Sequence, residues 1–353
     1  MTARGTDWGL AALVALLIAT GVLTLFAGTS GAGWVYALHD GLGFAIAVLL
    51  VFKLRRVWPR LAQPALRDRK LAVSVAALVF VLAAVGSGWL WDDGATVSPA
   101  GYSLLSWHDL LGAMLAIAVV GHMVLRAKRL RSRDVTHRRQ FLAGASIAVG
   151  SLLVWRAERP VQALLGLRGA HRRFTGSYEA ASFAGNAFPT TSWVADDPAP
   201  IDPGSYRLAV GGLVTTRLLL SLPDLSAVDE VTATLDCTGG FYSTQRWRGV
   251  RLSRLLEQAG AAPRARHLRV VSRTGYRWSF ALAEAPGLLL ATHIGDEPLS
   301  HDHGAPVRLV APSSRGFQWV KWVERVDLLE QPDYGAPAST LWSSLTAAGR
   351  GRE

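Results

Sequence analysis

The sequence predicts a bundle of membrane-spanning α-helices, four helices plus a fifth anchor helix, followed by an α+β domain that is mainly β. Long apolar runs fill residues 8–155, whereas residues 156–353 have the mixed composition of a globular domain, rich in Gly, Pro, Thr and Arg. Half of the 353 residues are hydrophobic, which is high for a soluble protein and low for a chain wholly embedded in lipid. We therefore expect a membrane part and a globular part that meet near Trp155.

Five apolar segments are predicted to form membrane helices: residues 8–26, 36–52, 71–91, 105–125 and 141–155. Their lengths approach the roughly 20 residues that cross a bilayer, although the last is short. Aromatic rings, which favour the headgroup region of a membrane, stand at the segment ends: Trp8, Trp34, Tyr36, Trp89, Trp91, Trp107 and Trp155. Length and flanking aromatics thus mark the same spans.

The formal charge of +11 is concentrated in two short loops. Residues 53–70 and residues 126–139 each hold seven Lys or Arg and one Asp, so the rest of the chain is close to neutral. This distribution removes the support for nucleic-acid binding that the charge alone would give. Cytoplasmic loops carry the excess of Lys and Arg, so we expect both loops inside the cell and the globular domain on the extracytoplasmic side of a multi-pass membrane protein.

The fifth segment begins with a pair of arginines. Residues 136–142 read Thr-His-Arg-Arg-Gln-Phe-Leu and precede a weakly hydrophobic run. This pattern resembles a twin-arginine export signal, the route taken by proteins that fold around a cofactor before translocation. Positive-inside charge is the alternative explanation, because paired arginines are common before membrane helices.

The first four segments resemble an internal duplication. Residues 39–43 read His-Asp-Gly-Leu-Gly, and residues 108–112 read His-Asp-Leu-Leu-Gly. Each run begins the second helix of a hairpin, so His39 and His108 are expected at the same outer depth. Two imidazoles that meet across a bundle hold a b-type haem from both faces, and small residues leave room for the macrocycle. The alternative is a pair of interfacial histidines whose side chains reach the headgroups.

His122 is a candidate ligand for a second haem. It follows His108 by fourteen residues, about 21 Å along an α-helix and within roughly 40° of the same face. The duplicated position is Lys53, so the obvious histidine partner is missing and we expect one haem. Residues 8–128 resemble the four-helix cytochromes of the b561 type and the haem-carrying membrane partner of the periplasmic methionine-sulfoxide reductase.

The globular part is predicted to be built mainly from short strands separated by Gly and Pro turns. The expected strands cover residues 206–214, 231–235, 267–272, 277–281 and 307–311, and a short helix is expected at residues 252–259.

Four segments of this domain resemble the sulfite-oxidase fold family of molybdopterin enzymes. They are Asp-Cys-Thr-Gly-Gly at residues 236–240, Trp-Arg-Gly-Val-Arg-Leu at 247–252, His-Gly-Ala-Pro-Val-Arg-Leu at 303–309, and Val-Lys-Trp at 320–322 after Gly316. The resemblance covers residues 180–330 and implies that Cys237 is the one protein ligand of molybdenum. A soft thiolate suits a metal already held by a dithiolene. The alternative is a buried structural cysteine. Because Cys237 is the only cysteine, an intrachain disulfide and multi-cysteine metal sites are excluded.

The same resemblance implies further cofactor contacts. Arg308 and Lys321 would hold the phosphate side of the molybdopterin, and His303 would donate to it. In residues 185–191, Asn186 is the member expected to reach the cofactor. Tyr242, five residues after Cys237, either overhangs the metal or has a packing role. Sulfite oxidases have a substrate-binding arginine in the early segment, and this chain has none there, which puts sulfite oxidation in doubt. The alternative is that a cation from elsewhere replaces it, supplied by Arg246, Arg248, Arg273 or Arg315.

Together these observations predict a membrane-bound molybdenum oxidoreductase. Electrons would pass between the quinone pool, a b-type haem and a molybdopterin centre that performs oxygen-atom transfer on a small oxo-donor or oxo-acceptor. Sulfoxide reduction is favoured over sulfite oxidation. The expected parts are residues 1–135 as a cytochrome b-like unit in the membrane lipid, residues 136–157 as the anchor, and residues 158–353 as the molybdopterin domain. The alternative is a haem electron carrier with a non-catalytic binding or sensor domain.

Overall fold

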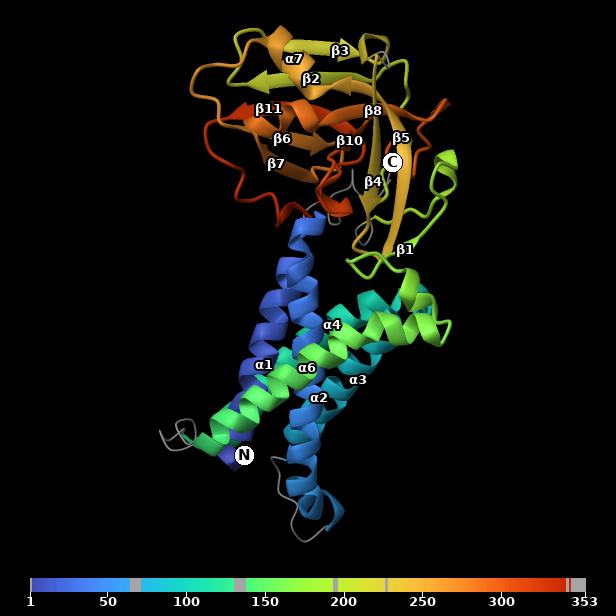
Figure 1. Cartoon of the computed structure of the whole chain (residues 1–353). Coiled ribbons are helices and arrows are strands. Elements are labelled where there is room, and N and C mark those ends of the chain that lie inside the picture. The colour runs from blue at the N-terminus through green and yellow to red at the C-terminus, as the bar shows by residue number, and fades with distance from the viewer. Residues whose placement is uncertain are drawn as a thin grey trace. The chain divides into compact units, whose positions relative to one another are not determined.

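The computed structural model describes residues 2–63, 71–129, 138–192, 196–225, 228–340 and 343. The chain divides into two compact units, Met1–Tyr178 and Glu179–Glu353. The first is helical and the second contains two β-sheets and a short helix (Figure 1). The predicted order of a helical bundle followed by a mixed α/β domain is thereby confirmed.

Four long helices form the bundle of the first unit: α1 (Ala3–Thr24), α2 (Gly33–Ala62), α3 (Leu71–Asp92) and α4 (Leu104–Arg126) (Figure 1). All four are long and apolar enough to cross a membrane. The first begins where the Thr2 hydroxyl accepts from the amide of Gly5, and the fourth where the Ser103 hydroxyl accepts from the amide of Ser106. These side-chain caps satisfy amides that a helix N-terminus leaves without partners.

The bundle has a small apolar centre to which each helix contributes one buried side chain: Val14, Ile46, Val81 and Leu115. Large apolar side chains also cover the outside, and that of Val124 is 80% exposed. An exposed apolar surface of this kind is expected where the surrounding solvent is lipid. The four predicted membrane helices are therefore confirmed as apolar helices of spanning length.

A fifth long helix, α6 (Arg138–Leu164), covers the predicted anchor segment and continues beyond Trp155. Its C-terminal end lies beside the end of α3, because Arg159 forms an ion pair with Asp92 at 3.5 Å and Gln162 donates to the same carboxylate at 2.9 Å. The first residues of the twin-arginine-like run, Thr136 and His137, lie outside the described residues. A fifth crossing and the export signal stay predictions.

The second unit contains two sheets (Figure 1). The first has the order β1-β5-β8-β10, with β4 beside β5 and β9 beside β8. Its strands are β1 (Tyr178–Glu179), β4 (Asp229–Asp236), β5 (Phe241–Arg251), β8 (Leu289–Ile294), β9 (Glu297–Pro298) and β10 (Arg308–Val310). The second sheet has the order β3-β2-β11-β6-β7, and its β11–β2 pair is parallel. Its strands are β2 (Arg207–Gly212), β3 (Leu218–Ser221), β6 (His267–Ser272), β7 (Arg277–Ala281) and β11 (Val323–Leu329).

The five predicted strands and the predicted helix are present, whereas several other strands were missed. One of the missed strands is β5. Its sequence is rich in arginines and other polar residues, and some of these occupy buried positions, so it lacks a clear alternation of apolar and polar residues. In contrast, α7 (Leu252–Ala259) buries Leu252, Leu255, Leu256 and Ala259, the i, i+3, i+4, i+7 spacing of one helix face. Gly260, with φ of 69°, ends that helix.

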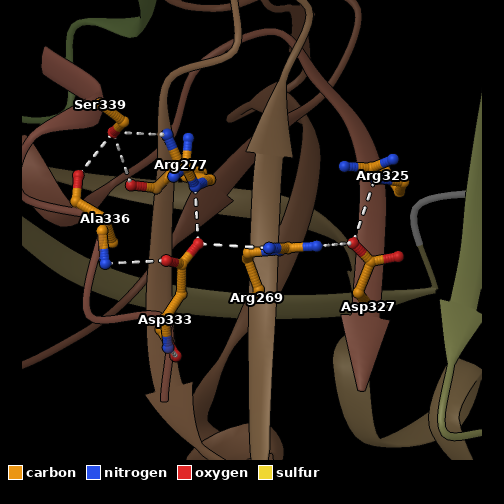
Figure 2. Close-up of polar contacts among 9 residues, drawn as sticks. Arg269, Arg277, Arg325, Asp327, Asp333, Ala336 and Ser339 are labelled. Carbon is orange, nitrogen blue, oxygen red and sulfur yellow. Dashed lines mark hydrogen bonds and ion pairs between the residues drawn. The ribbon is translucent and has the colours of Figure 1, made fainter. Parts of the chain in front are cut away.

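A network of ion pairs attaches the segment after β11 to the second sheet (Figure 2). The Arg269 guanidinium on β6 contacts Asp327 at 2.7 Å and Asp333 at 3.3 Å, and Arg277 on β7 donates to Asp333 at 2.6 Å. The Ser339 hydroxyl accepts from the Arg277 amide at 3.2 Å. The chain that leaves β11 therefore returns across β6 and β7 along this polar surface.

Candidate active site

Cys237 lies in the tight connection between β4 and β5. Its amide donates to the Phe241 carbonyl at 2.8 Å, and the Gly240 amide donates back to the Cys237 carbonyl at 3.0 Å. Gly240 has φ of 99°, which favours glycine. The Cys237 side chain is 8% exposed. The hairpin thus holds the thiol at the end of a rigid strand pair.

Two segments approach the thiol closely. The Gly239 amide donates to Cys237 Sγ at 3.3 Å, and Thr191 hydrogen-bonds to the same sulfur. A Cβ atom at Gly316 would lie 3.0 Å from Cys237 Cα, so this approach requires glycine. Burial raises the pKa of the Cys237 thiol, while these hydrogen bonds and the charges of Arg315 and Lys321 act in the opposite direction. A bound metal cation would reverse this effect and stabilise the thiolate.

A cavity of about 110 Å³ opens at the sulfur. Its walls combine small polar side chains, aromatic rings and two charged groups: Thr191, Ser192, Asp196, Cys237, Thr238, Ser272, Tyr276, Gly316, Phe317, Trp319, Lys321 and Trp322. Burial raises the pKa of Asp196, and its Oδ1 atom has no hydrogen-bond partner among the described residues. The cavity therefore offers an acid, a cation and a thiol in one place.

Two cations lie at this cavity: Lys321, which is half-buried and lines it, and Arg308, which is buried beside it. Arg308 is 2% exposed, donates to the His303 carbonyl at 3.0 Å and lies with its guanidinium carbon 5.0 Å from the Trp247 ring centroid. Lys321 donates to Ser192 Oγ at 3.0 Å. Burial lowers the pKa of Arg308, and burial together with the Arg308 charge lowers that of Lys321 to about 8. Both cations are thus held in surroundings that would favour a bound anion.

Gly304 allows Arg308 and Lys321 to approach the same stretch of backbone. It has φ of 103°, and a Cβ atom there would lie 3.0 Å from Lys321 Cβ and 3.1 Å from Arg308 Cβ. Next to it, His303 is buried, with Nδ1 2.7 Å from Ser300 Oγ and Nε2 3.2 Å from the Phe188 carbonyl. Burial, with the neighbouring Arg308 charge, lowers the pKa of His303 to about 4. The imidazole is therefore neutral at physiological pH.

Of the six expected site residues, Cys237 and Lys321 line the described part of the cavity, whereas Arg308, His303, Asn186 and Tyr242 do not. The Asn186 amide donates to Glu297 and to the Pro298 carbonyl, at 3.2 and 3.0 Å, and accepts from the Ser300 amide at 3.0 Å. It therefore fastens residues 185–187 to the loop that leads to His303. Tyr242 lies opposite Asp236 in the β4–β5 pair. Neither placement tests the expected roles, which stay predictions.

A buried ion pair beside Cys237 was not assigned to the site from the sequence. Arg315 donates to Asp236 at 2.7 Å, and both side chains are nearly inaccessible. Asp236 directly precedes Cys237, and Arg315 directly precedes Gly316, so the pair ties together the two segments that meet at the thiol. Asp196 and Tyr276 were also missed, because their positions in the sequence carry no recognisable motif. Trp322 ends the Val-Lys-Trp segment, but the sequence analysis gave it no role in the site.

The second unit is similar in sequence to known molybdopterin oxidoreductases. Residues 195–336 match the family "Oxidoreductase molybdopterin binding domain". Mitochondrial sulfite oxidase of Rattus norvegicus is 36% identical over 172 residues, covering 39% of this chain and 32% of the relative. The protein-methionine-sulfoxide reductase catalytic subunit MsrP of Gluconobacter oxydans is 30% identical over 183 residues, covering 46% of this chain and 55% of the relative.

The second unit contains a sulfite-oxidase-like molybdopterin-binding domain. A solved structure, the sulfane dehydrogenase SoxCD from Paracoccus pantotrophus, is 28% identical with a TM-score of 0.36 and covers 38% of this chain and 41% of that one. The chain spans about a third to about a half of the length of these relatives.

The residues of the molybdopterin-binding domain fit its cofactor. The buried Nε atoms of Arg308 and Arg315 have no hydrogen-bond partner among the described residues, and no carboxylate lies within ion-pair distance of Arg308 in the described part of the chain. An anionic, many-acceptor cofactor supplies what such donors lack. The described residues also contain no group of three or more His, Cys, Asp or Glu that could hold a metal ion. Cys237 with a pterin dithiolene is consistent with this donor set.

In the helical unit the structure brings His39 and His108 together. Their ring centroids are 6.0 Å apart with an interplanar angle of 78°. Nδ1 of His39 lies 2.9 Å from Thr20 Oγ1, and Nδ1 of His108 lies 2.8 Å from the Ala84 carbonyl. A ring held through one nitrogen presents the other as a metal ligand. Two metal–imidazole bonds of about 2 Å would fill most of the space between the centroids.

The duplication also shows in the packing of these rings. A Cβ atom at Gly21 of α1 would lie 3.5 Å from the His39 ring, and one at Gly88 of α3 would lie 3.1 Å from the His108 ring. Each glycine follows a hydroxyl residue, Thr20 or Ser87. His122, in contrast, has Lys53 in place of a partner histidine among the described residues, with its Nε2 3.4 Å from Lys53 Nζ.

Proposed function

We propose that this chain is a membrane-bound molybdenum oxidoreductase that passes electrons between the quinone pool, a b-type haem and a molybdopterin centre, and that the centre reduces a sulfoxide-like substrate. The observation that carries the proposal is the single buried thiol at a cavity beside two cations, in a domain related to sulfite oxidase and MsrP. The domain is expected on the extracytoplasmic side, reached through the twin-arginine-like run.

A neutral oxo-donor is favoured over sulfite because no arginine is placed to bind an anionic substrate among the four that could replace the missing one. Arg315, Arg273 and Arg248 each contact a carboxylate within 3.0 Å, and Arg246 lies 4.0 Å from Asp296. Among the described residues, none of these four arginines lines the cavity at Cys237, and Lys321 is the only cation on its wall. An anionic substrate would need a cation beyond the one expected to hold the cofactor phosphate. A sulfoxide needs only a hydrogen-bond donor or acid.

The chain's own groups have definite tasks in this scheme. Molybdenum bound to a dithiolene supplies the oxygen-atom transfer when it is present. Cys237 would ligate the metal, and Arg308 and Lys321 would hold the phosphate side. Neutral His303 would hydrogen-bond the pterin by giving up the 3.2 Å contact of its Nε2 with the Phe188 carbonyl. Asp196 has a raised pKa because it is buried, so it is suited to deliver a proton at its carboxyl oxygen. Reduction of a sulfoxide consumes two electrons and two protons and releases water.

His39 and His108 would hold the haem that exchanges single electrons with the quinone pool. The histidine pair, its Nδ1 partners and the small residues that face the rings support a single haem in the half of the bundle that contains both rings. The direction from quinol to substrate follows from the choice of a sulfoxide as electron acceptor.

The first experiment measures metal and haem content of the detergent-purified full chain, by elemental analysis and a pyridine haemochrome spectrum. Viologen-driven reduction of methionine sulfoxide and ferricyanide-linked oxidation of sulfite are assayed on the same samples. We expect molybdenum, b-type haem and sulfoxide reduction, and Cys237→Ser should lower that activity by roughly a thousandfold or more with haem content unchanged. Ser205→Ala, in the exposed turn at residues 202–205, is the control.

Haem without molybdenum in protein matured with the cofactor would contradict the proposal and favour a haem electron carrier with a non-catalytic binding domain. Sulfite oxidation as the faster reaction would contradict the substrate assignment alone.

A further inference from the structure

The helical unit contains a second polar cluster, far along the bundle from the histidine pair. Lys53 follows His39, and His122 follows His108, by fourteen residues each, about 21 Å along a helix. A cavity of about 310 Å³ opens there and is lined by α1, α2, α3 and α4. Its walls are mainly apolar: Leu10, Val14, Ile46, Leu78, Val81 and Leu115. This volume is at the lower end of the range for sites that hold small organic molecules.

Three polar side chains meet on the wall of this cavity. Lys53 Nζ lies 3.0 Å from Asp7 Oδ1 and 3.4 Å from His122 Nε2. The other ring nitrogen, His122 Nδ1, is buried without a hydrogen-bond partner among the described residues. The cluster therefore offers a carboxylate, an ammonium group and an unused imidazole nitrogen. A buried nitrogen of this kind is stabilised when a ligand donates to it or accepts from it.

Cationic residues surround the cavity one helical turn further out. Arg4 precedes Asp7 by three residues, Arg56 follows Lys53 by three, and Arg126 follows His122 by four, all in the direction of the same helix ends. All three line the cavity. A phosphate headgroup would pair with these arginines and stay at the rim. A neutral ring on an apolar tail can lie deeper, where Asp7 and Lys53 compensate each other's charge.

We propose that the cavity at Asp7, Lys53 and His122 binds the ring of a membrane quinol and is where electrons enter the chain. This inference rests on the proposed function. Oxidation of the quinol to the quinone releases two electrons and two protons. The electrons would pass one at a time to a haem held by His39 and His108. The Lys53 ammonium donates to His122 Nε2, so His122 Nδ1 carries the ring proton and would donate a hydrogen bond to a quinol oxygen. The two quinol protons would leave in turn to the Asp7 carboxylate and from there to water.

The same contacts argue against a second haem here. An ammonium group paired with a carboxylate has no lone pair to give to iron, so Lys53 is no counterpart of a second histidine. Lys53 instead orients His122 through one nitrogen and leaves the other for the ligand.

The test measures binding of a decyl-tailed benzoquinone and a short-chain naphthoquinone to the full chain in detergent micelles, by separation of bound from free quinone and chromatographic quantification. We expect near-stoichiometric binding of at least one probe. Lys53→Met and His122→Gln should each weaken it about tenfold, the effect of losing one hydrogen bond to a charged or buried group. Arg55→Gln is the matched control, since Arg55 is exposed on α2 and does not line the cavity.

Binding is measured again on His39→Ala/His108→Ala, which separates this inference from the proposed electron chain. If the quinone binds to the His39→Ala/His108→Ala protein, and if adding Lys53→Met to that protein weakens binding, the quinone site is supported even where the haem proposal fails. Equal binding by wild type, Lys53→Met and His122→Gln would overturn it. So would a second haem that disappears in His122→Gln, or a retained phospholipid that disappears in Lys53→Met.

Discussion

The two candidate cofactor sites of this protein are built in opposite ways. The histidine pair of the helical unit comes from one motif used twice, with the same kind of contacts on each ring: a glycine at its face and a polar atom at its Nδ1. The thiol site of the second unit draws two to five residues from each of four separate stretches of the chain, and the ion pair beside the thiol joins residues 79 positions apart. A repeated motif can be recognised by comparing the chain with itself, whereas a convergent site has no internal template.

The largest effect is expected when one member of the repeated histidine pair is removed. His108→Ala should lower haem affinity by roughly a hundredfold or more, because a haem then keeps a single axial ligand. Thr20→Val, which removes the Nδ1 partner of His39, should cost roughly tenfold. Haem content is measured by pyridine haemochrome, and molybdenum content should stay constant. The control is His171→Ala, because His171 is an exposed histidine of the helical unit. Undiminished haem in His108→Ala would exclude the pair as the binding site.

A second test compares glycines of the two sites. Gly304→Ala should destabilise the molybdopterin-binding domain by about 2–4 kcal/mol, because the positive φ and the close approach of Arg308 and Lys321 both penalise a side chain. Gly88→Ala should leave unfolding unchanged within about 1 kcal/mol and lower haem content, since its Cβ meets only the His108 ring. Chemical denaturation checks both. Gly41→Ala, with no atom within 4 Å of the added Cβ, is the control.

The smallest expected effect concerns pH. The pKa of Lys321 is lowered to about 8, so in the cofactor-free site it loses its proton as pH rises through 8. Affinity for the anionic cofactor should then fall by at most about tenfold per pH unit above pH 8 and stay constant below it. Lys321→Arg should remove this fall. Cofactor release at pH 7 to 10 measures it, and an identical profile in both proteins would contradict the role of Lys321.

The stability of the cofactor-free protein should change with pH in the opposite direction to its affinity for the cofactor. An unfolded lysine has a pKa near 10.5, so the unfolded chain binds more protons than the folded chain between pH 8 and 10.5, and stability rises with pH across that window. Thermal unfolding of cofactor-free protein at pH 8 and pH 10 provides the comparison.

Residue pattern alone predicts the helical bundle, because a bilayer imposes length and hydropathy on each helix separately. It also placed His39 and His108 together, since a duplication relates their depths, and it singled out Cys237 by motif and by the absence of another cysteine. The short strands with a clear alternation were predicted for the same local reason, whereas β5 was missed because polar residues interrupt its pattern.

Only the tertiary structure decided which residues surround the thiol. Asp196, Tyr276 and Trp322 reach the cavity because loops from different strands converge there, and Arg315 meets Asp236 only after the fold has brought distant segments together. Likewise, Asp7 joins Lys53 and His122 through the packing of α1 against α2 and α4. Pattern and composition act along the chain, whereas burial, charge compensation and cavities depend on neighbours that the chain acquires on folding.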